Sequence, residues 1–430
     1  MNIIFFAIVL IAVVFAGWNQ LCWVPIADQT APIAALSKAM VASATGAVDL
    51  AIGLIGVMTL FLGLMKVAEA GGMLKILARL IRPLMVKLFP EVPPEHPAMG
   101  AMILNLSANA LGLGNAATPF GIRAMQALDQ LNPQKGTATD AMVLFLAINT
   151  SSVTLLPTGV IALRAAAGST DPAGILPTTL LATIGSTLTA ILAAKFYGRL
   201  FRKNTQTADG DEIQTEPALQ DAPVPLEEEA GAYPLWVSLL ALGILIAMVP
   251  VTVIFGQVIS PWILPGLMLG FLGFGVVRRV RVYEEFVEGA KEGFKVAVKI
   301  IPYLVAILVA VGMFRASGAL DTLVGALGPW TSRMGLPADA LPMALMRPLS
   351  GSGAYGILAS IIQDPAIGPD SYIGYLVSTL QGTTETTFYV LAVYFGAVQV
   401  RRIRHALAAA LTADVAGVIF AIIACTLFLG

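Results

Sequence analysis

The segment Leu380–Tyr389 reads Leu-Gln-Gly-Thr-Thr-Glu-Thr-Thr-Phe-Tyr and lies inside an apolar stretch that runs from Ser371 to Val398. All positions from 381 to 387 are polar or glycine. A bilayer accepts such a run only where the polar groups face protein or a water-filled cavity. We therefore predict that this segment forms half of a binding site inside a membrane protein.

A second segment of the same type lies in the first half of the chain. Residues 149–154 read Asn-Thr-Ser-Ser-Val-Thr and interrupt the apolar stretch 139–163. Pro157 follows closely, and we expect it to kink the helix and to free backbone carbonyl groups as ligands. The two polar segments together predict a site to which both halves of the chain contribute.

Composition places the chain among multi-pass membrane proteins. Of its 430 residues 57% are apolar and 12% are charged, and the mean hydropathy is +0.83. Soluble domains carry about a quarter charged residues. The net charge of −1 gives no basic surface for nucleic acid. We expect the cytoplasmic membrane as the location.

Motifs of enzymes and metal sites are missing from the sequence. Cys22 and Cys425 are far apart, and His96 and His405 have no metal-binding spacing. The sequence contains neither a nucleophile elbow nor a Walker motif. We therefore expect a protein that is not an enzyme and that holds neither a metal nor a cofactor.

Apolar stretches of about 20 residues predict membrane crossings. By that length about nine crossings are expected, at 2–20, 47–68, 139–163, 173–197, 234–255, 257–277, 294–314, 371–398 and 403–429. Two further stretches, 97–118 and 340–362, are apolar but interrupted by Gly, Pro, Asn or Ser. We predict that both are re-entrant hairpins buried in protein. The fold class predicted is an all-α polytopic membrane protein.

The chain divides into two similar halves. Residues 204–232 are acidic and poor in apolar residues, which predicts a solvated cytoplasmic linker between 1–203 and 233–430. The order of segments within 48–165 recurs within 294–400, with Pro83 matching Pro329. Such an internal repeat affects the prediction of the whole architecture.

Basic clusters predict how the halves lie in the membrane. They fall at 75–87, 195–203, 278–281 and 401–404, and the positive-inside rule assigns all of them to the cytoplasm. All four agree only if the two hairpins do not cross. The halves are then inverted relative to each other, as in many secondary transporters, with the N-terminus inside and the C-terminus outside.

The same residues resemble a known family. Asn105–Gly121 and Asn149–Ser152 look like the spore maturation protein A family, and 347–354 and 381–396 look like the spore maturation protein B family. The chain thus resembles a fusion of the two. Both halves also resemble the nucleoside-recognition Gate domain. The resemblance implies a domain that is shared with nucleoside transporters and with the membrane part of the ferrous iron transporter.

Glu385 is the acidic residue that the predicted binding site makes most important. A carboxylate in the middle of a crossing is costly unless it is paired, protonated or bound to a cation. It either coordinates Na⁺ or H⁺, or accepts hydrogen bonds from a polar solute, or forms a structural ion pair with Arg347. Arg347 in turn either binds an anion or neutralises Glu385.

The other candidate ligands are hydroxyl and amide side chains of the hairpins and the polar segments. In the first half they are Asn105, Ser107, Asn109, Asn115, Asn149, Thr150, Ser151 and Ser152. In the second half they are Ser350, Ser352, Gln381, Thr383, Thr384 and Thr386. The alternative is that they hydrogen-bond within and between helices. Asp414 is a candidate proton relay, or else a cap near the cluster at 401–404.

The leading hypothesis is a secondary transporter or permease for a small polar solute or ion, with Na⁺ or H⁺ as the candidate coupling ion. The sequence leaves the oligomeric state open, with a homodimer as one candidate. Two alternatives remain. The first is a non-transporting scaffold for envelope proteins or spore maturation, and the second is a translocator of lipid-linked precursors. Its environment in all three cases is the lipid bilayer.

Overall fold

The computed structural model of the protein describes residues 2–24, 30–112, 114–202 and 233–429. Over these residues the fold consists of helices and connecting turns, and the one extended pairing is an isolated bridge between Thr137 and Arg402. The predicted linker 204–232 lies outside the described residues. The all-helical class predicted from the sequence is confirmed for the part described.

The helices of the first half are α1 (Asn2–Leu21), α2 (Pro32–Ala70), α3 (Met73–Leu88), α4 (Pro97–Ala110), α5 (Gly114–Gln130), α6 (Asp140–Thr150), α7 (Thr158–Ala166) and α8 (Leu176–Arg202). Those of the second half are α9 (Leu235–Val277), α10 (Val282–Ala316), α11 (Ala319–Arg333), η1 (Ala338–Ala340), α12 (Leu341–Met346), α13 (Gly351–Ile362), α14 (Tyr372–Thr383), α15 (Thr387–Gly396) and α16 (Ala406–Leu429).

The order of elements repeats between the halves. A long helix, a shorter helix, a helical hairpin, a broken helix and a last long helix follow one another as α2 to α8 and again as α10 to α16. In the broken helices the chain leaves the helical conformation between α6 and α7 and again between α14 and α15. Pro157 lies at the end of the first break, directly before α7.

Contacts between distant segments define two ends of the molecule. One end holds Arg402 and Arg404, and we call it the basic end. There the main-chain N–H of Ala138 donates to the carbonyl oxygen of Arg402, and Arg404 pairs with Asp140 at 2.8 Å. At the far end, Arg164 pairs with Asp370 at 3.1 Å. The two broken helices and the helices α8 and α16 run between these ends.

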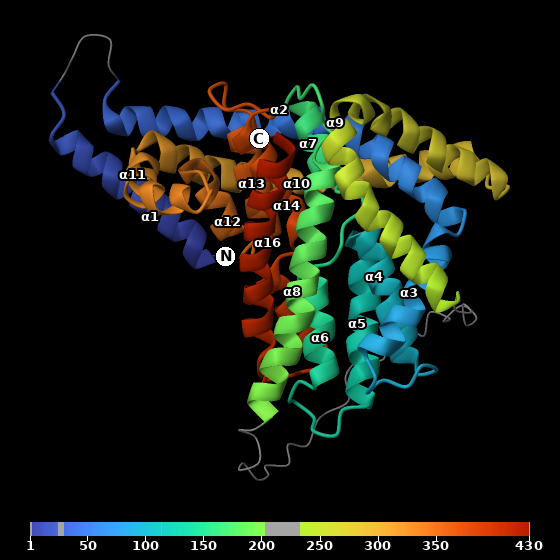
Figure 1. Cartoon of the computed structure of the whole chain (residues 1–430). Coiled ribbons are helices and arrows are strands. Elements are labelled where there is room, and N and C mark those ends of the chain that lie inside the picture. The colour runs from blue at the N-terminus through green and yellow to red at the C-terminus, as the bar shows by residue number, and fades with distance from the viewer. Residues whose placement is uncertain (1, 25–29, 113, 203–232, 430) are drawn as a thin grey trace.

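Equivalent elements run in opposite directions between the two ends. In Figure 1 α8 runs down the view to the basic end, whereas α16 runs up from it to the C-terminus. The two broken helices also run oppositely. The α6–α7 segment starts at the basic end, whereas the α14–α15 segment starts at the far end. The hairpin α4–α5 enters from the basic end, and its turn reaches the first break, where Leu155 N–H donates to Ala110.

The core divides around the two breaks. One buried cluster, with Met99, Met142 and Phe145, joins α4, α5, α6, α8, α15 and α16 toward the basic end. Another, with Leu358 and Leu376, joins α2, α7, α10, α13 and α14 toward the far end. The non-helical segments therefore lie between two apolar layers, which hold the polar chain in place.

The long helices α2 and α10 run differently from the prediction. They pack along each other and cross the upper part of the view in Figure 1, over the far end, whereas α8 and α16 run down it. The crossings predicted at 47–68 and 294–314 therefore do not lie parallel to those at 173–197 and 403–429. An apolar stretch of sufficient length does not by itself fix a helix's direction.

The prediction of two separate crossings, at 234–255 and 257–277, is wrong. The structure has one continuous helix there, α9, with 43 residues. At 1.5 Å per residue it is about 64 Å long. The prediction cut a long apolar run according to the thickness of a bilayer, although no polar loop separates the two parts.

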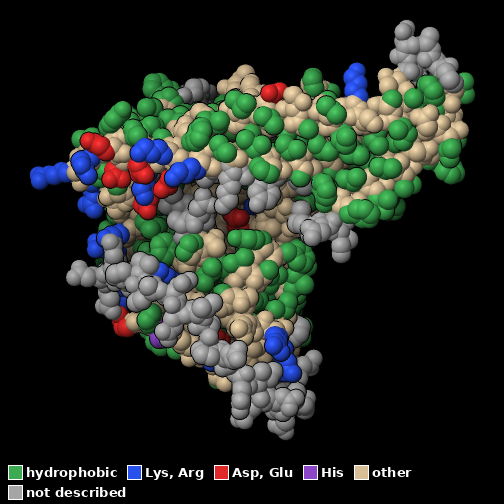
Figure 2. Space-filling view, turned by 180° about the vertical axis from the view of Figure 1, so that it is seen from behind, with side chains coloured by type: hydrophobic (Ala, Val, Ile, Leu, Met, Phe, Trp, Pro, Cys, Tyr) green, Lys and Arg blue, Asp and Glu red, His purple; other side chains and the backbone are tan. Residues whose placement is uncertain are grey.

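The surface is that of a membrane protein. Three of the described helices are long and apolar enough to cross a bilayer by length and composition: Pro32–Ala70, Leu176–Leu200 and Ala406–Leu429. Figure 2 shows hydrophobic side chains over most of the upper arm, with charged side chains gathered at one end of it. Large exposed side chains include Trp18, Trp236 and Trp330. Exposed apolar surface on this scale is typical of contact with lipid or with another protein.

Candidate functional site

The two helix breaks lie against each other. The main-chain N–H of Glu385 in the second break donates to the carbonyl oxygen of Thr150 at the start of the first, with an N–O distance of 2.8 Å. Gly382 lies close to Pro157 and to Thr179 of α8. The polar segments from the two halves therefore meet, as the sequence predicts.

Each break also contacts the hairpin of its own half. Leu155 N–H donates to the carbonyl of Ala110 at 2.9 Å, and Phe388 N–H donates to the carbonyl of Pro348 at 3.2 Å. Gly112 has a φ of +75°, and a Cβ atom there would collide with the carbonyl oxygen of Leu156. The glycine therefore permits both the left-handed turn and the close approach.

Arg347 is buried and holds the second break in shape. Its Nε donates to the carbonyl of Gln381 at 3.0 Å and its Nη1 to Oγ1 of Thr386 at 3.1 Å. Its Nη2 donates to the carbonyl of Thr384. These carbonyls end α14, where a cation is favourable. The guanidinium therefore replaces the hydrogen bonds that the helix loses at the break.

Glu385 is not the buried carboxylate that the sequence predicts. Its side chain is 51% exposed, and its Oε2 lies 3.6 Å from Nη2 of Arg347. Its neighbours Thr384, Thr386 and Thr387 are buried. Because the backbone is non-helical here, successive side chains point in different directions, and the carboxylate turns outward. The ion pair with Arg347 that we held as an alternative is present.

A second polar cluster joins the first hairpin to both broken helices. Asn109 Nδ2 donates to Oδ1 of Asn149 at 3.0 Å, and Asn105 Nδ2 donates to the hydroxyl of Tyr394 at 3.1 Å. That hydroxyl lies 3.4 Å from Oδ1 of Asn149. Two of the predicted amide residues, Asn105 and Asn149, thus contact one tyrosine from the other half of the chain, and Asn109 joins them through Asn149.

Several predicted hydroxyl ligands instead bond to their own backbone. Thr150 and Ser151 both donate to the carbonyl of Ala147, and Ser152 to that of Asn149. Thr383 donates to Thr379 in the same way. The alternative of hydrogen bonds within the helix therefore describes these side chains better than a role as direct ligands.

The remaining candidates differ in their surroundings. Ser350 caps α13 by accepting from Gly353 N–H at 3.0 Å, and Ser352 is exposed beside it. Buried polar atoms without a hydrogen-bond partner include Oδ1 of Asn105, Oγ of Ser107 and Oε1 of Gln381. The side chain of Asn115 lies outside the described residues. Unpartnered buried atoms of this kind are where water or a solute is expected.

Asp414 joins the site through α15 rather than through the basic cluster. Its Oδ2 accepts a hydrogen bond of 2.7 Å from Thr387 Oγ1, at the first residue of α15. Its Oδ1 is buried and has no hydrogen-bond partner. Both Asp414 and Arg347 line a small cavity beside the second break. The cap near 401–404 that we considered is therefore not formed.

Comparison with known proteins gives the family. The Gate family, described as nucleoside recognition, matches residues 51–167 and 297–401, together more than half of the chain. The chain belongs to the Gate family. Its two Gate regions contain the two hairpins and the two helix breaks.

Two relatives match different parts of the chain, as in a fusion. Spore maturation protein B of Bacillus subtilis (strain 168) is 48% identical over 167 residues, which are 39% of this chain and 93% of that protein. Spore maturation protein A of the same organism is 42% identical over 196 residues, 46% of this chain and 94% of that protein. No solved structure matches the chain.

Arg164 in the first Gate region was missed by the sequence analysis. It is fully buried, and its Nη1 donates to the carbonyl of Pro369 at 2.6 Å. Its Nη2 lies 3.1 Å from Oδ1 of Asp370, and its guanidinium lies 4.2 Å from the centre of the Tyr375 ring. The signal was an arginine within the apolar run of α7, which deserved the same weight as Glu385.

Tyr394 in the second Gate region was missed for another reason. Its position in α15 gives no hint that its hydroxyl crosses to the first half. A Cβ atom on Gly121 of α5 would collide with the Tyr394 ring, so this close packing depends on a glycine that is distant in sequence.

Over the described residues, no group of three or more His, Cys, Asp and Glu side chains could hold a metal ion.

Proposed function

We propose that this Gate protein is a secondary transporter or permease that moves a small polar solute across the cytoplasmic membrane. The observation that supports this best is the meeting of two broken helices from different halves, with Thr150 and Glu385 joined by a backbone hydrogen bond. Broken helices that meet between repeats are the usual construction of solute sites in secondary transporters.

The directions of the elements support two inverted repeats. α8 and α16 run oppositely between the basic end and the far end, and so do the two broken helices. With the basic clusters in the cytoplasm, the C-terminus lies outside. Alternating access then requires one repeat to move against the other around the meeting point of the breaks.

The chemistry at the breaks favours a solute with hydrogen-bond donors. Glu385 offers an exposed carboxylate, and Asn105 and Gln381 each have a buried side-chain oxygen without a partner. Nucleosides carry N–H and O–H groups that suit such acceptors. The description of the Gate family as nucleoside recognition puts nucleosides first among the solutes to be tested.

Flux into proteoliposomes tests the proposal. The purified protein is reconstituted, and uptake of labelled nucleosides and other small polar solutes is measured. Glu385→Gln is expected to reduce the initial rate for the transported solute about tenfold or more, since a hydrogen bond to a charged group contributes about 1.5–3 kcal/mol. Glu288→Gln is the matched control, because Glu288 is an exposed carboxylate paired with Lys291 at 2.9 Å on α10.

Two results would count against transport. One is an absence of flux for every solute of the panel. The other is a rate for Glu385→Gln equal to that of the unchanged protein. If Glu385→Gln leaves cell-envelope phenotypes intact while no flux is found, the non-transporting scaffold becomes the better explanation.

We assign the coupling cation, Na⁺ or H⁺, to Asp414. A buried carboxyl group is stable only when it is protonated, paired or bound to a cation, and Asp414 has one hydrogen bond, from Thr387 at the start of α15. Asp414→Asn is therefore expected to remove the dependence of flux on an imposed ion gradient while solute binding persists. Comparing imposed Na⁺ and pH gradients identifies the ion.

A further inference from the structure

Arg347 lies between two carboxyl groups that differ in exposure. On one side its Nη2 is 3.6 Å from Oε2 of Glu385, whose side chain is 51% exposed. On the other side Arg347 and Asp414 line the same small cavity, and the side chain of Asp414 is buried. One guanidinium therefore faces an outer and an inner carboxyl group, and its single positive charge can balance only one of them when both are ionised.

The cavity between Arg347 and Asp414 is too small and too apolar for a metal ion. Its volume of about 10 Å³ is that needed by one water molecule, and the rest of its lining is Thr383, Thr384 and five apolar or glycine residues. The hydroxyl of Thr383 already donates to Thr379, and the carbonyl of Thr384 accepts from Arg347. A hard cation requires several oxygen ligands, and the guanidinium would repel it. The cation that fits is a proton on Asp414.

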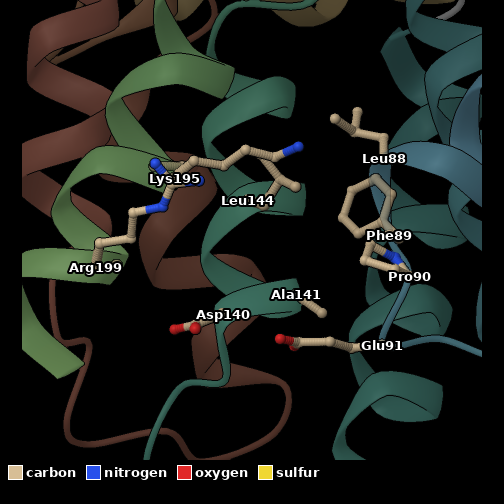
Figure 3. A pocket seen from close by; sticks show the side chains of 11 residues that line it. Leu88, Phe89, Pro90, Glu91, Asp140, Ala141, Leu144, Lys195 and Arg199 are labelled. Atoms are coloured by element: carbon tan, nitrogen blue, oxygen red, sulfur yellow. The ribbon is translucent and has the colours of Figure 1, made fainter.

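The remaining charged groups that the structure describes lie away from this cavity. Of the helices packed against α16, α9, α14 and α15 contain no acidic or basic residue, and tyrosines are neutral near pH 7. On α8, Ser186 donates to the main chain one residue before Asp414 and so lies level with it. Lys195 follows nine residues later, about 14 Å further toward the basic end, in a separate cleft (Figure 3). The same end holds Asp140, Arg199, Arg404 and His405.

We propose that Asp414 binds the coupling proton and that this proton and the solute at Glu385 oppose each other's binding through Arg347, so that the protein exchanges its solute for H⁺. This inference rests on the proposed transport function. While Asp414 is protonated, Arg347 balances the charge of Glu385. When Asp414 is ionised, the two carboxylates share one guanidinium and repel each other.

The sign of the coupling follows from this shared charge. A solute that donates hydrogen bonds to Glu385, or carries a positive charge, weakens the repulsion and leaves Arg347 to Asp414. Solute binding therefore favours breakage of the Asp414 O–H bond; the electron pair stays on the carboxylate, and the proton leaves to the water on the side where the site is open. By linkage, the proton weakens solute binding by the same factor. The site then returns across the membrane with either the solute or the proton.

Infrared difference spectroscopy of the full-length protein in detergent tests the inference without transport. The carbonyl band of protonated Asp414 is identified by its loss in Asp414→Asn. Glu385→Gln removes the outer charge, as a bound solute would balance it, so the ratio of protonated to ionised Asp414 at a given pH is expected to fall about tenfold or more. Glu288→Gln changes an exposed carboxylate on α10 and is expected to leave the ratio unchanged.

Three infrared results would overturn the inference. They are an equal or larger band in Glu385→Gln, the absence at every pH of a band that Asp414→Asn removes, and a loss of the band when Na⁺ replaces choline at constant pH.

Solute binding provides a second arm of the test. Any nucleoside or small amine that raises the melting temperature is expected to bind more tightly at alkaline than at acid pH, and Asp414→Asn is expected to reduce that dependence. A dependence that Asp414→Asn leaves unchanged would contradict the coupling. If no solute binds, the transport proposal fails, while the infrared result still decides whether Glu385 and Asp414 are coupled.

Discussion

At the scale of single residues, Arg347 has a role that only arginine can fill. Its three nitrogens donate to Gln381, Thr384 and Thr386 at once, and a planar guanidinium presents donors in a fork that an ammonium group does not have. The shape of the second break therefore depends on this one side chain.

Arg347→Lys is expected to destabilise the protein by about 3 kcal/mol, because buried carbonyls of the break lose charge-assisted donors. The melting temperature in detergent measures this, with Arg333→Lys at the exposed end of α11 as the control. A melting temperature within about one degree of that of the unchanged protein would show that water or other donors replace the guanidinium.

The residue scale also shows what could be predicted from sequence. The meeting of 149–152 with 381–387 follows from polar residues that a bilayer does not tolerate outside a site. The exposure of Glu385 does not follow, because it depends on the direction of a side chain within a non-helical segment. Arg164 and Tyr394 act across the two halves, and their partners, among them Asp370 and Asn105, have no sequence pattern in common with them.

At the scale of elements, the turn of the first hairpin is fixed by Gly112. Gly112→Ala is expected to destabilise the protein by about 1–3 kcal/mol, because alanine tolerates a positive φ poorly and its Cβ would collide with Leu156. Thermal unfolding measures the loss, and solute binding measures whether the break moves. Gly100→Ala in α4 is the control, since a Cβ there meets nothing within 4 Å. Equal melting temperatures for the two variants would contradict this account.

The stability of the fold at the far end is predicted to depend on pH through Asp370. Burial raises the pKa of its carboxyl, but hydrogen bonds from Ser169 and Thr170 and the charge of Arg164 outweigh burial and hold the pKa below its ordinary value of 3.8. A carboxyl group whose pKa is lowered by folding stabilises the fold above its ordinary pKa and loses that contribution as the pH falls through the lowered value.

Acidification to about pH 3 is therefore expected to lower the melting temperature more for the unchanged protein than for Asp370→Asn. Differences between the two proteins isolate this group, because Asp171, which lies nearby and faces Tyr375, is present in both. Parallel pH profiles for the two proteins would show that the pair with Arg164 does not stabilise the fold.

Sequence patterns predicted these elements unevenly. Glycine, proline and asparagine within apolar stretches indicate where the helices are interrupted, and the structure has helix ends at these places. That the two hairpins are re-entrant stays a prediction. The undivided α9 and the transverse course of α2 and α10 could not be predicted in this way. Apolar length reports that a helix avoids water, and its direction is set by the helices it packs against.

At the scale of the whole molecule, the arrangement of the two ends predicts labelling from opposite sides of the membrane. In a background with Cys22→Ser and Cys425→Ala, cysteines at Arg199 and Arg402 are expected to react with a membrane-impermeant reagent from the cytoplasmic side. A cysteine at Ala366, which is exposed between α13 and α14, is expected to react from the other side. Reaction of all three from one side would contradict the inverted arrangement.

The hydrogen bond between Thr150 and Glu385 joins segments that belong to different halves of one chain. Residues 1–202 and 233–430, produced as two polypeptides, are therefore expected to reassemble the contact when they are coexpressed, which copurification through a tag on one fragment measures. Failure to copurify would show that the halves need more than their mutual surface. In the single chain each half meets the other at an effective concentration of the order of mM. Dilution of the protein in a large membrane therefore leaves the two broken helices together, and their pairing does not depend on the level of expression.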